Sequence, residues 1–292
     1  MSSITLVTTG GTIASSRDEH GISRPGAGAL PFDVGADVTV RELMVKDSSS
    51  VNFADMDRMV DAVSLALRDL DCRGVVVLHG TDTMEESALL VDLFHDDPRP
   101  VVFTGAQRTA DHSDPDGPVN VAAAVGAALD PTHRNRGVLV AFGGKVLPAR
   151  GLSKLHTSEL DAFVSSAEPR IVLPRVAIGG VRVDIVSLYP GVDAVAIDAY
   201  RAAGAQGIVL QALGSGNTNA AVVRAVEKCV AQNIRVVVTT RVPLGSIAPT
   251  YGGGGGGADL VDAGAEFSPQ LRAGQARILL AAQIAQSARH CA

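Results

Sequence analysis

Short runs of β-branched and apolar residues recur along the chain, separated by longer segments. Most positions in each run are apolar or β-branched, and each run is shorter than a typical helix. The runs occupy residues 4–9, 75–78, 101–104, 138–142, 183–187, 208–210 and 234–240. Strands of this kind are typical of parallel sheets that helices cover on both faces. The pattern therefore predicts an α/β fold with mostly parallel sheets.

One segment between the first two runs has the spacing of an amphipathic helix. Across residues 55–70, apolar residues recur every three or four positions, with Asp and Arg residues between them. The apolar positions are Met56, Met59, Val60, Val63, Leu67 and Leu70. Neighbouring parallel strands need a crossover connection of this kind. Ligands are then expected outside the carboxyl ends of the strands.

The length and composition allow two domains. The chain has 292 residues, of which 46% are hydrophobic, and this supplies apolar side chains for two cores of ordinary size. Residues 165–180 contain Pro169, Pro174 and a glycine pair but no amphipathic helix, which predicts a linker. We therefore expect a larger N-terminal α/β domain over residues 1–164 and a smaller C-terminal α/β domain over residues 181–292.

Glycine and cysteine residues predict local features of the structure. Six consecutive glycines at residues 252–257 predict a mobile surface loop without a regular element, because glycine loses the most backbone entropy on ordering. Three cysteines, Cys72, Cys229 and Cys291, are widely spaced and include no CxxC pair. Neither a disulfide framework nor a zinc site is therefore expected. We interpret Cys72 and Cys229 as small buried residues and Cys291 as a terminal thiol.

Charge and hydropathy argue against two classes of partner. The chain has 25 basic and 31 acidic residues, a net charge of -6, and no dense Lys/Arg cluster, so nucleic acid is not an expected partner. No apolar run approaches the roughly 20 residues that a membrane-spanning helix needs. The start of the chain lacks a basic stretch followed by an apolar run and a cleavage site. A soluble, cytoplasmic protein is expected.

The first sequence motif follows the first strand-like run directly. It reads TTGGTIAS over residues 8–15, and its two glycines allow a sharp turn with close approach of main-chain N–H groups. This turn would leave the hydroxyl of Thr12 exposed at the carboxyl edge of the sheet, where it can attack a substrate carbon. A phosphate-binding loop is the alternative, although GxGxxG is not matched and GxxxxGK[ST] does not occur. Spacing alone leaves both interpretations open.

The second motif follows the second run and reads HGTDTMEE over residues 79–86. Thr83 and Glu86 have the spacing of a capping box, which predicts that a helix begins here. Thr81 and Asp82 would then lie in the loop between strand and helix. A carboxylate in that loop can hold a substrate ammonium group, and a neighbouring hydroxyl can orient water or assist proton transfer. In the alternative interpretation, Asp82 and Thr83 only cap the helix.

The two motifs, in this order and each after a strand, resemble the signatures of the L-asparaginase and glutaminase family. The resemblance covers essentially the whole chain. It continues through GAQRTADHSDPDGPVN (105–120), NRGVLV (135–140), ARGLSKLHT (149–157), TRVPLGS (240–246) and QARILL (275–280). It implies two α/β domains, of which the smaller is flavodoxin-like. It also implies a homotetramer of close dimers, with each site between the N-terminal domain of one subunit and the C-terminal domain of its neighbour.

The resemblance also assigns catalytic roles to particular residues. Thr12 matches the family's threonine nucleophile, and Thr81 and Asp82 match the pair that assists it. Lys154, in the segment SKLHT, matches the lysine that completes this second group. Its ammonium would hydrogen-bond to Thr81 and ease deprotonation of that hydroxyl. No metal or organic cofactor is implied.

Substrate contacts follow from the same resemblance. The serines that precede the crossover helix place Ser48, with Ser49 beside it, at the substrate α-carboxylate, while Asp82 would hold the substrate ammonium. Ser215, in GSGNTN, stands where the family has an asparagine. The complete set of expected substrate contacts is Gly11, Ser48, Ser49, Gly80, Thr81, Asp82, Ala106 and Ser215.

The sequence also departs from the family pattern in two places. Many members have a tyrosine in the loop beside the nucleophile, but residues 15–35 contain none; His20 and Arg24 are the polar candidates there, and both are also typical of an ordinary surface. A glutamate that a neighbouring subunit contributes in some members has no clear counterpart. Tyr251 and Asp259, on either side of the glycine run, are the candidates to replace it.

The activity that the resemblance implies is hydrolysis of L-asparagine to L-aspartate and ammonia through an acyl-enzyme, with minor glutaminase activity. Two alternatives remain open. One is an amidotransferase subunit that supplies ammonia, which carries an additional N-terminal module; a strand that begins at Ile4 leaves no expected room for one. The other is a non-catalytic amino-acid-binding homologue. The presence of Thr12, Thr81, Asp82 and Lys154 together argues against it.

Overall fold

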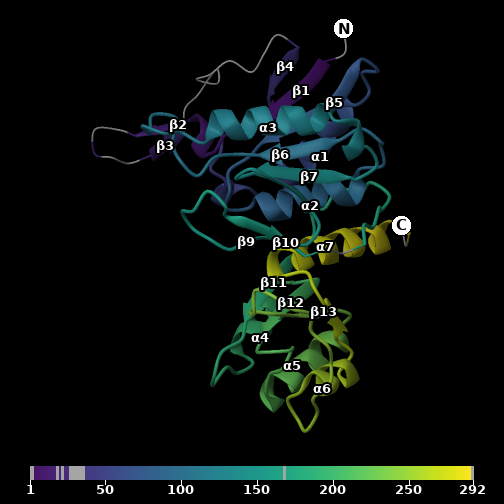
Figure 1. Cartoon of the computed structure of the whole chain (residues 1–292). Helices are drawn as coiled ribbons and strands as arrows, with labels where there is room; N and C mark the ends of the chain where they lie inside the picture. Colours follow the sequence, from purple (N-terminus) through teal and green to yellow (C-terminus); the bar gives the residue numbers. More distant parts are fainter. Residues whose placement is uncertain (1–2, 18–19, 21–22, 26–36, 167–168, 291–292) are drawn as a thin grey trace. The chain divides into compact units, whose positions relative to one another are not determined.

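Figure 1 shows the computed structural model of the chain, which describes residues 3–17, 20, 23–25, 37–166 and 169–290. The chain divides into two compact units, Met1–Arg175 and Val176–Ala292. Residues 169–178 contain no helix or strand. None of the described helices is both long enough and apolar enough to span a membrane.

The first unit is built on a six-stranded sheet with the order β4-β1-β5-β6-β7-β8. Its strands are β1 (Ser3–Thr8), β4 (Val38–Glu42), β5 (Cys72–Leu78), β6 (Val101–Thr104), β7 (Val138–Phe142) and β8 (Lys145–Pro148). Only the β7–β8 pair is antiparallel among these. The predicted parallel strands of this domain are therefore confirmed. The four central strands are almost entirely buried, as their apolar sequences require.

Helices cover both faces of this sheet. They are α1 (Phe53–Ala66), α2 (Met84–Phe94) and α3 (Gly117–Leu129). The helix α3 packs on β5, β6 and β7 from one side, and α1 and α2 pack against each other on the opposite side (Figure 1). Single turns of 3-10 helix, η1 (Thr12–Ala14), η2 (Ser48–Ser50) and η3 (Pro131–His133), lie in the connections. The predicted α/β architecture is confirmed.

The crossover helix α1 is displaced from its predicted bounds of residues 55–70. It begins after Asn52, whose side chain accepts the N–H of Asp55 at 3.0 Å while Asp55 accepts the N–H of Asn52 at 3.2 Å. This capping box fixes the start of the helix, because it satisfies two N–H groups that have no partner within the helix. The helix ends at Ala66, and Leu70 is 93% exposed in the turn before β5. Leu70 therefore does not belong to the apolar face.

Two small antiparallel sheets complete the first unit. The strands β2 (Ser15–Arg17) and β3 (Ser23–Pro25) pair directly after the first motif. The strands β9 (Leu152–Lys154) and β10 (Phe163–Ser165) form the other pair. These short strands were not predicted, because they lack a long apolar run. They matter for the site because β9 carries Lys154.

The second unit contains a four-stranded parallel sheet with the order β11-β12-β13-β14. The strands are β11 (Val183–Ser187), β12 (Gly207–Ala212), β13 (Arg235–Thr240) and β14 (Glu266–Phe267). The helices are α4 (Val195–Ala202), α5 (Ala220–Val230), α6 (Gly257–Asp262) and α7 (Ala273–His290). The helix α7 covers one face, while α4, α5 and α6 lie on the other (Figure 1). The predicted smaller C-terminal α/β domain is confirmed as a fold.

The glycine run forms a hydrogen-bonded turn that leads into α6. One carboxylate oxygen of Asp259, Oδ2, accepts the N–H groups of Gly254, Gly255 and Gly256 at 3.0, 2.9 and 2.7 Å. A Cβ atom at Gly255 would lie 2.8 Å from the carbonyl oxygen of Thr218. The expectation that no regular element begins in this run is wrong, because α6 begins at Gly257. Close backbone packing explains Gly255, Gly256 and Gly257, whereas Gly253 and Gly254 have positive φ angles.

The prediction that Cys72 and Cys229 are buried is confirmed. Cys72 and Cys229 are free thiols and are almost fully buried. Cys72 lies at the start of β5, where its Sγ is 3.2 Å from the carbonyl oxygen of Gly74. Cys291 lies outside the described residues.

Candidate active site

The two sequence motifs meet at one edge of the first sheet. The strands β1 and β5 are adjacent and parallel, with Thr8 opposite Leu78, so the loops that follow them start side by side. A Cβ atom at Gly11 would lie 2.8 Å from the Cα of Gly80. The two loops therefore pack backbone against backbone, which only glycine permits at this distance. Gly11 also has a φ angle of +92°, a conformation that side-chain-bearing residues rarely adopt.

Thr12 is the first residue of η1, directly after the glycine turn, and is half-buried. The hydroxyl of Ser15 donates to the carbonyl oxygen of Gly11 at 3.0 Å, and the N–H of Ala110 donates to the carbonyl oxygen of Ser15 at 3.0 Å. These bonds hold the turn that presents Thr12. Among the residues that the structure describes, none forms a hydrogen bond with the Thr12 hydroxyl.

Thr81, Asp82 and Lys154 form a hydrogen-bonded cluster next to this turn. The ammonium nitrogen of Lys154 lies 2.8 Å from the Thr81 hydroxyl oxygen and 3.2 Å from Asp82 Oδ1. The Lys154 side chain is only 18% exposed, whereas that of Asp82 is 64% exposed. Lys154 therefore donates to Thr81 in a partly desolvated position, and a nearby positive charge favours the deprotonated hydroxyl. Asp82 keeps a carboxylate surface that a ligand can reach.

Ser48 joins the second motif from the segment before α1. It is buried, and its hydroxyl oxygen accepts the N–H of Asp82 at 3.2 Å. Its carbonyl oxygen accepts the hydroxyl of Thr83 at 2.8 Å. The side chain of Ser49, the next residue in η2, is exposed. Of the two serines, Ser48 is therefore the one that contacts the Asp82 loop.

The bond between Thr83 and Ser48 corrects one detail of the predicted helix start. The helix α2 begins at Met84 with Thr83 as its N-cap, as the motif predicted. The Thr83 side chain accepts no cap hydrogen bond from the helix, and its hydroxyl donates to the carbonyl oxygen of Ser48. Thr83 thus connects α2 to η2.

The remaining predicted contacts lie in several places. Gly80 faces Ser48, since a Cβ atom there would lie 2.5 Å from the Ser48 hydroxyl oxygen. Ala106 is buried in the loop after β6. Ser215 belongs to the second unit, where its hydroxyl oxygen accepts the side-chain N–H of Asn217 at 3.4 Å.

The residues considered as replacements for missing family groups are only partly described. His20 is exposed in a turn, and Arg24 lies in β3, with its side chain outside the described atoms. Residues 18–19, 21–22 and 26–36 of the same loop also lie outside the description. Asp259 binds the glycine turn, as shown above, and Tyr251 is 61% exposed.

Gln107 and Asp116 were not among the predicted site residues. The Thr81 hydroxyl lies 3.4 Å from Gln107 Oε1, and Gln107 Nε2 donates to the carbonyl oxygen of Glu159 at 3.0 Å. Asp116 accepts the main-chain N–H groups of Gln107 and Arg108 at 3.0 and 2.9 Å. The signal that points to Gln107 is its position just after the buried strand β6.

His79, at the start of the second motif, is a buried neutral residue. Burial lowers the pKa of its imidazole to about 4, although a hydrogen bond to the Gly80 carbonyl oxygen opposes the shift. The Nδ1 atom lies 2.7 Å from that oxygen and donates to it. His79 is therefore uncharged at neutral pH and supports the turn that carries Thr81.

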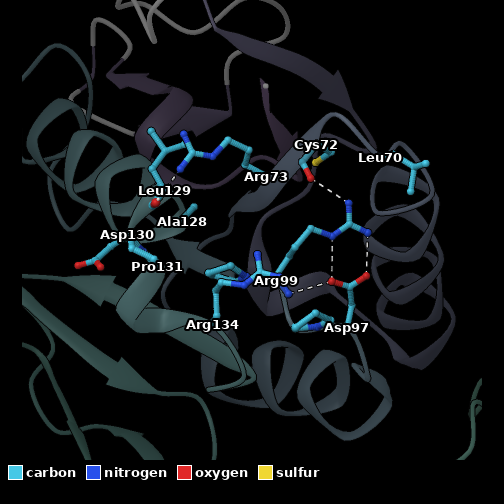
Figure 2. A pocket seen from close by; sticks show the side chains of 12 residues that line it. Leu70, Cys72, Arg73, Asp97, Arg99, Ala128, Leu129, Asp130, Pro131 and Arg134 are labelled. Carbon is cyan, nitrogen blue, oxygen red and sulfur yellow. Dashed lines mark hydrogen bonds and ion pairs between the residues drawn. The ribbon is translucent and has the colours of Figure 1, made fainter. Parts of the chain in front are cut away.

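A cavity of about 560 Å³ lies at the amino-terminal ends of the strands, opposite the candidate site (Figure 2). Its lining includes Cys72 at the start of β5 and Pro100 just before β6, together with Arg73, Arg99 and Arg134. Arg99 forms an ion pair with Asp97 at 2.7 Å. Strand direction therefore separates this cavity from the edge that carries Thr12 and Thr81.

Family models match the chain almost from end to end. The model "Asparaginase, N-terminal" matches residues 3–184, and the model "Glutaminase/Asparaginase C-terminal domain" matches residues 182–291. A probable L-asparaginase of Deinococcus radiodurans is 36% identical, with 95% of this chain and 91% of that protein covered. An L-asparaginase of Bacillus licheniformis is 31% identical, with 97% and 95% covered.

A solved structure agrees with these matches. The crystal structure of a probable cytoplasmic L-asparaginase from Campylobacter jejuni superposes with a TM-score of 0.83 at 27% identity, covering 97% of this chain and 95% of that one. Fold, motifs and sequence relatives thus agree over the full length of both units, and the chain belongs to the asparaginase family.

Proposed function

We propose that this protein hydrolyses L-asparagine to L-aspartate and ammonia. The observation that carries the proposal is the contact of the Lys154 ammonium with Thr81 and Asp82, beside the turn that presents Thr12. A hydroxyl, a carboxylate and a cation thus lie next to the neighbouring loop, which carries the hydroxyl of Thr12. The relatives named L-asparaginase support the choice of substrate.

Thr12 is the proposed nucleophile. Its oxygen bonds to the side-chain amide carbon of asparagine, and its proton passes to the amide nitrogen, which leaves as ammonia. Water then adds to the acyl-enzyme, and cleavage of the ester restores the Thr12 hydroxyl and yields L-aspartate. Main-chain N–H groups near Thr12 or Thr81 stabilise the oxyanion, a contribution typically of several kcal/mol.

Thr81, Asp82 and Lys154 assist this chemistry in the proposal. Because the Lys154 ammonium donates to the Thr81 oxygen, it stabilises that hydroxyl as it loses its proton to a reacting group. Thr81 thereby serves as a proton carrier for the attacking water or for the leaving nitrogen. His79 does not compete for this role, because it is buried behind the turn.

Opposite charges orient the substrate in the proposal. Asp82 has an exposed carboxylate for the substrate ammonium. The Ser48 oxygen already accepts the Asp82 N–H, so its own proton is available for the substrate α-carboxylate, with Ser49 beside it. Further contacts are assigned to Gly11, Gly80, Thr81, Ala106 and Ser215.

The same proposal extends to the organisation of the protein. We assign residues 165–180 as the linker between domains 1–164 and 181–292. We also assign a cytoplasmic homotetramer of close dimers, in which Ser215 of one subunit reaches a site on its neighbour. The Campylobacter jejuni protein of known structure is named a probable cytoplasmic L-asparaginase, which supports the location. Minor glutaminase activity is part of the proposal.

Ammonia release from L-asparagine and L-glutamine by the purified protein tests the activity. We expect a higher kcat/KM for L-asparagine, and an equal or higher value for L-glutamine would contradict the stated preference. Thr12→Ala should abolish turnover while L-aspartate still binds in calorimetry. Asp82→Asn should weaken that binding instead, because the ammonium loses its counter-charge.

The outcomes of this experiment separate the candidate functions. Binding of L-aspartate by the wild type without any ammonia release would favour the non-catalytic amino-acid-binding homologue. Near-normal turnover by Thr12→Ala would show that Thr12 is not the nucleophile, and the Thr81 hydroxyl would then be the next group to test.

A further inference from the structure

Glu85 joins the second motif to the strand that carries Lys154. It is the second residue of α2, and its carboxylate oxygen Oε2 accepts the main-chain N–H of Lys154 at 2.7 Å. Thr81 and Asp82, a few residues earlier, bind the ammonium end of the same lysine. One loop and the first turn of one helix therefore hold Lys154 at both its main chain and its Nζ atom.

The strand β9 has a free outer edge at which such a contact can form. It pairs only with β10 in a two-stranded sheet of the described chain. Lys154 lies opposite Phe163 of β10, and the next N–H, that of Leu155, donates to Ala162 at 2.8 Å. Because N–H groups alternate in direction along a strand, that of Lys154 points away from β10. Glu85 occupies this outer edge.

Charge also suits Glu85 to this place. Burial raises the pKa of its carboxyl group, while the N–H and the ammonium charge of Lys154 oppose that rise. The N-terminus of α2 favours a negative charge in its first turn. The partly buried carboxylate thus has two local sources of stabilisation, and one of them is the residue that it positions.

We propose that Glu85 is a positioning residue: it holds the main chain of Lys154 where the ammonium group can hydrogen-bond to Thr81. This inference rests on the proposed function. Its hydrogen bond fixes the main chain of β9 against α2. The lysine side chain then spans the remaining distance to Thr81 and Asp82. Without this bond, β9 moves relative to the loop, and the ammonium no longer stays within hydrogen-bond distance of the Thr81 oxygen.

Three substitutions separate the length of the side chain from its charge. Glu85→Gln keeps the length and a carbonyl acceptor, Glu85→Asp keeps the charge but falls short of β9, and Glu85→Ala removes both. We expect Glu85→Gln to keep kcat within about threefold of the wild type. Glu85→Asp and Glu85→Ala should lower kcat by about 10- to 100-fold, the cost of misplacing a catalytic group by about an ångström. The KM value should change much less, because Ser48 and Asp82 stay in place.

A matched control and a double-mutant cycle test whether Glu85 acts through Lys154. Asp96→Ala removes an exposed carboxylate just beyond the other end of α2 and should leave kcat unchanged. In a Lys154→Met background, Glu85→Ala should cause little further loss. An equal loss in both backgrounds would show a general structural role and overturn the proposal. A kcat for Glu85→Gln as low as that for Glu85→Ala would also overturn it.

Hydrogen exchange at the Lys154 amide, followed by NMR, gives a readout that needs no activity. Exchange should be slow in the wild type and in Glu85→Gln, and faster in Glu85→Asp. Because Glu85→Asp is a conservative change, it tests the contact even where Glu85→Ala does not fold. Unchanged exchange in Glu85→Asp would overturn the positioning role. A wild type that binds L-aspartate without releasing ammonia would instead refute the proposed function, and the exchange rates would still decide whether Glu85 holds β9.

Discussion

At the scale of single residues, one ammonium group in the candidate site forms hydrogen bonds to two oxygen atoms. Lys154 contacts Thr81 and Asp82, whereas Thr12 lies on a different loop and makes no described hydrogen bond through its hydroxyl. In the proposed mechanism, Lys154 assists proton transfer through Thr81, and Thr12 is the nucleophile. Gly11 lets the two loops touch, because a Cβ atom there would lie 2.8 Å from the Cα of Gly80.

Lys154→Met should lower kcat by about 100-fold or more, because it leaves Thr81 without its charged partner. Thr81→Val should cause a similar loss, since it removes the hydroxyl on which Lys154 acts. The double variant should be hardly worse than either single variant, because residues that act as a unit are not additive. Steady-state rates of ammonia release measure all three. Additive losses in the double variant would mean that Thr81 and Lys154 act independently.

The motifs predicted most of these residues, because each motif combines a strand end with a chemically distinctive loop. Glu85 and Gln107 escaped prediction for a physical reason. The bond from Glu85 reaches Lys154 on β9, and Gln107 approaches Thr81 from the loop after β6. Such pairings depend on how strands and helices pack, and no local spacing encodes them.

At the scale of elements, apolar pattern and exposure decided which strands were predictable. The strands β6, β7 and β11 have the predicted bounds, since each is a short run in which most residues are apolar or β-branched. The strand β4 was missed because four of its five residues are exposed at the sheet edge. The helix α1 was predicted in place but not in extent, because Asn52 and the exposed turn at Leu70 set its ends.

One element-scale contact gives a pH dependence of stability. Arg99, just before β6, donates to both carboxylate oxygens of Asp97 and to the carbonyl oxygen of Cys72 at the start of β5 (Figure 2). It also donates to the carbonyl oxygen of Asp69. The hydrogen bond from Arg99 is the largest cause that lowers the pKa of Asp97 below its usual value of 3.8. A lowered folded-state pKa means that the carboxylate stabilises the fold above pH 3.8. That stabilisation is lost as the pH falls through the folded-state value.

Asp97→Asn should therefore lower the free energy of unfolding of the first unit at pH 7 by about 1 kcal/mol. This is the contribution of a charged hydrogen bond, reduced because the pair is partly exposed to solvent. Below the folded-state pKa of Asp97, the free energies of unfolding of the variant and the wild type should become equal, because the wild-type carboxyl group is then also neutral. Urea unfolding at pH 7 and at acid pH measures both values. A difference that stays constant with pH would show that the ion pair is not its source.

At the scale of the whole molecule, the expected contacts are divided between the two units. Thr12, Thr81, Asp82 and Lys154 belong to the first unit, whereas Ser215 belongs to the second. Sequence alone predicted the two α/β units, because each has its own set of apolar strands. Whether Ser215 contacts a site on another copy of the chain depends on assembly, which apolar pattern and local motifs do not encode.

We predict that the active form is a homotetramer whose sites are shared between subunits, and mixing two inactive variants tests this directly. Thr12→Ala removes the nucleophile from the first unit, and Ser215→Trp blocks the proposed contact from the second. In a hybrid close dimer, one site would carry both changes and the other would carry neither. Activity should therefore rise when the two variants are unfolded, mixed and refolded together, and light scattering should show a tetramer. A mixture that stays as inactive as each variant refolded alone would show that each chain closes its own site.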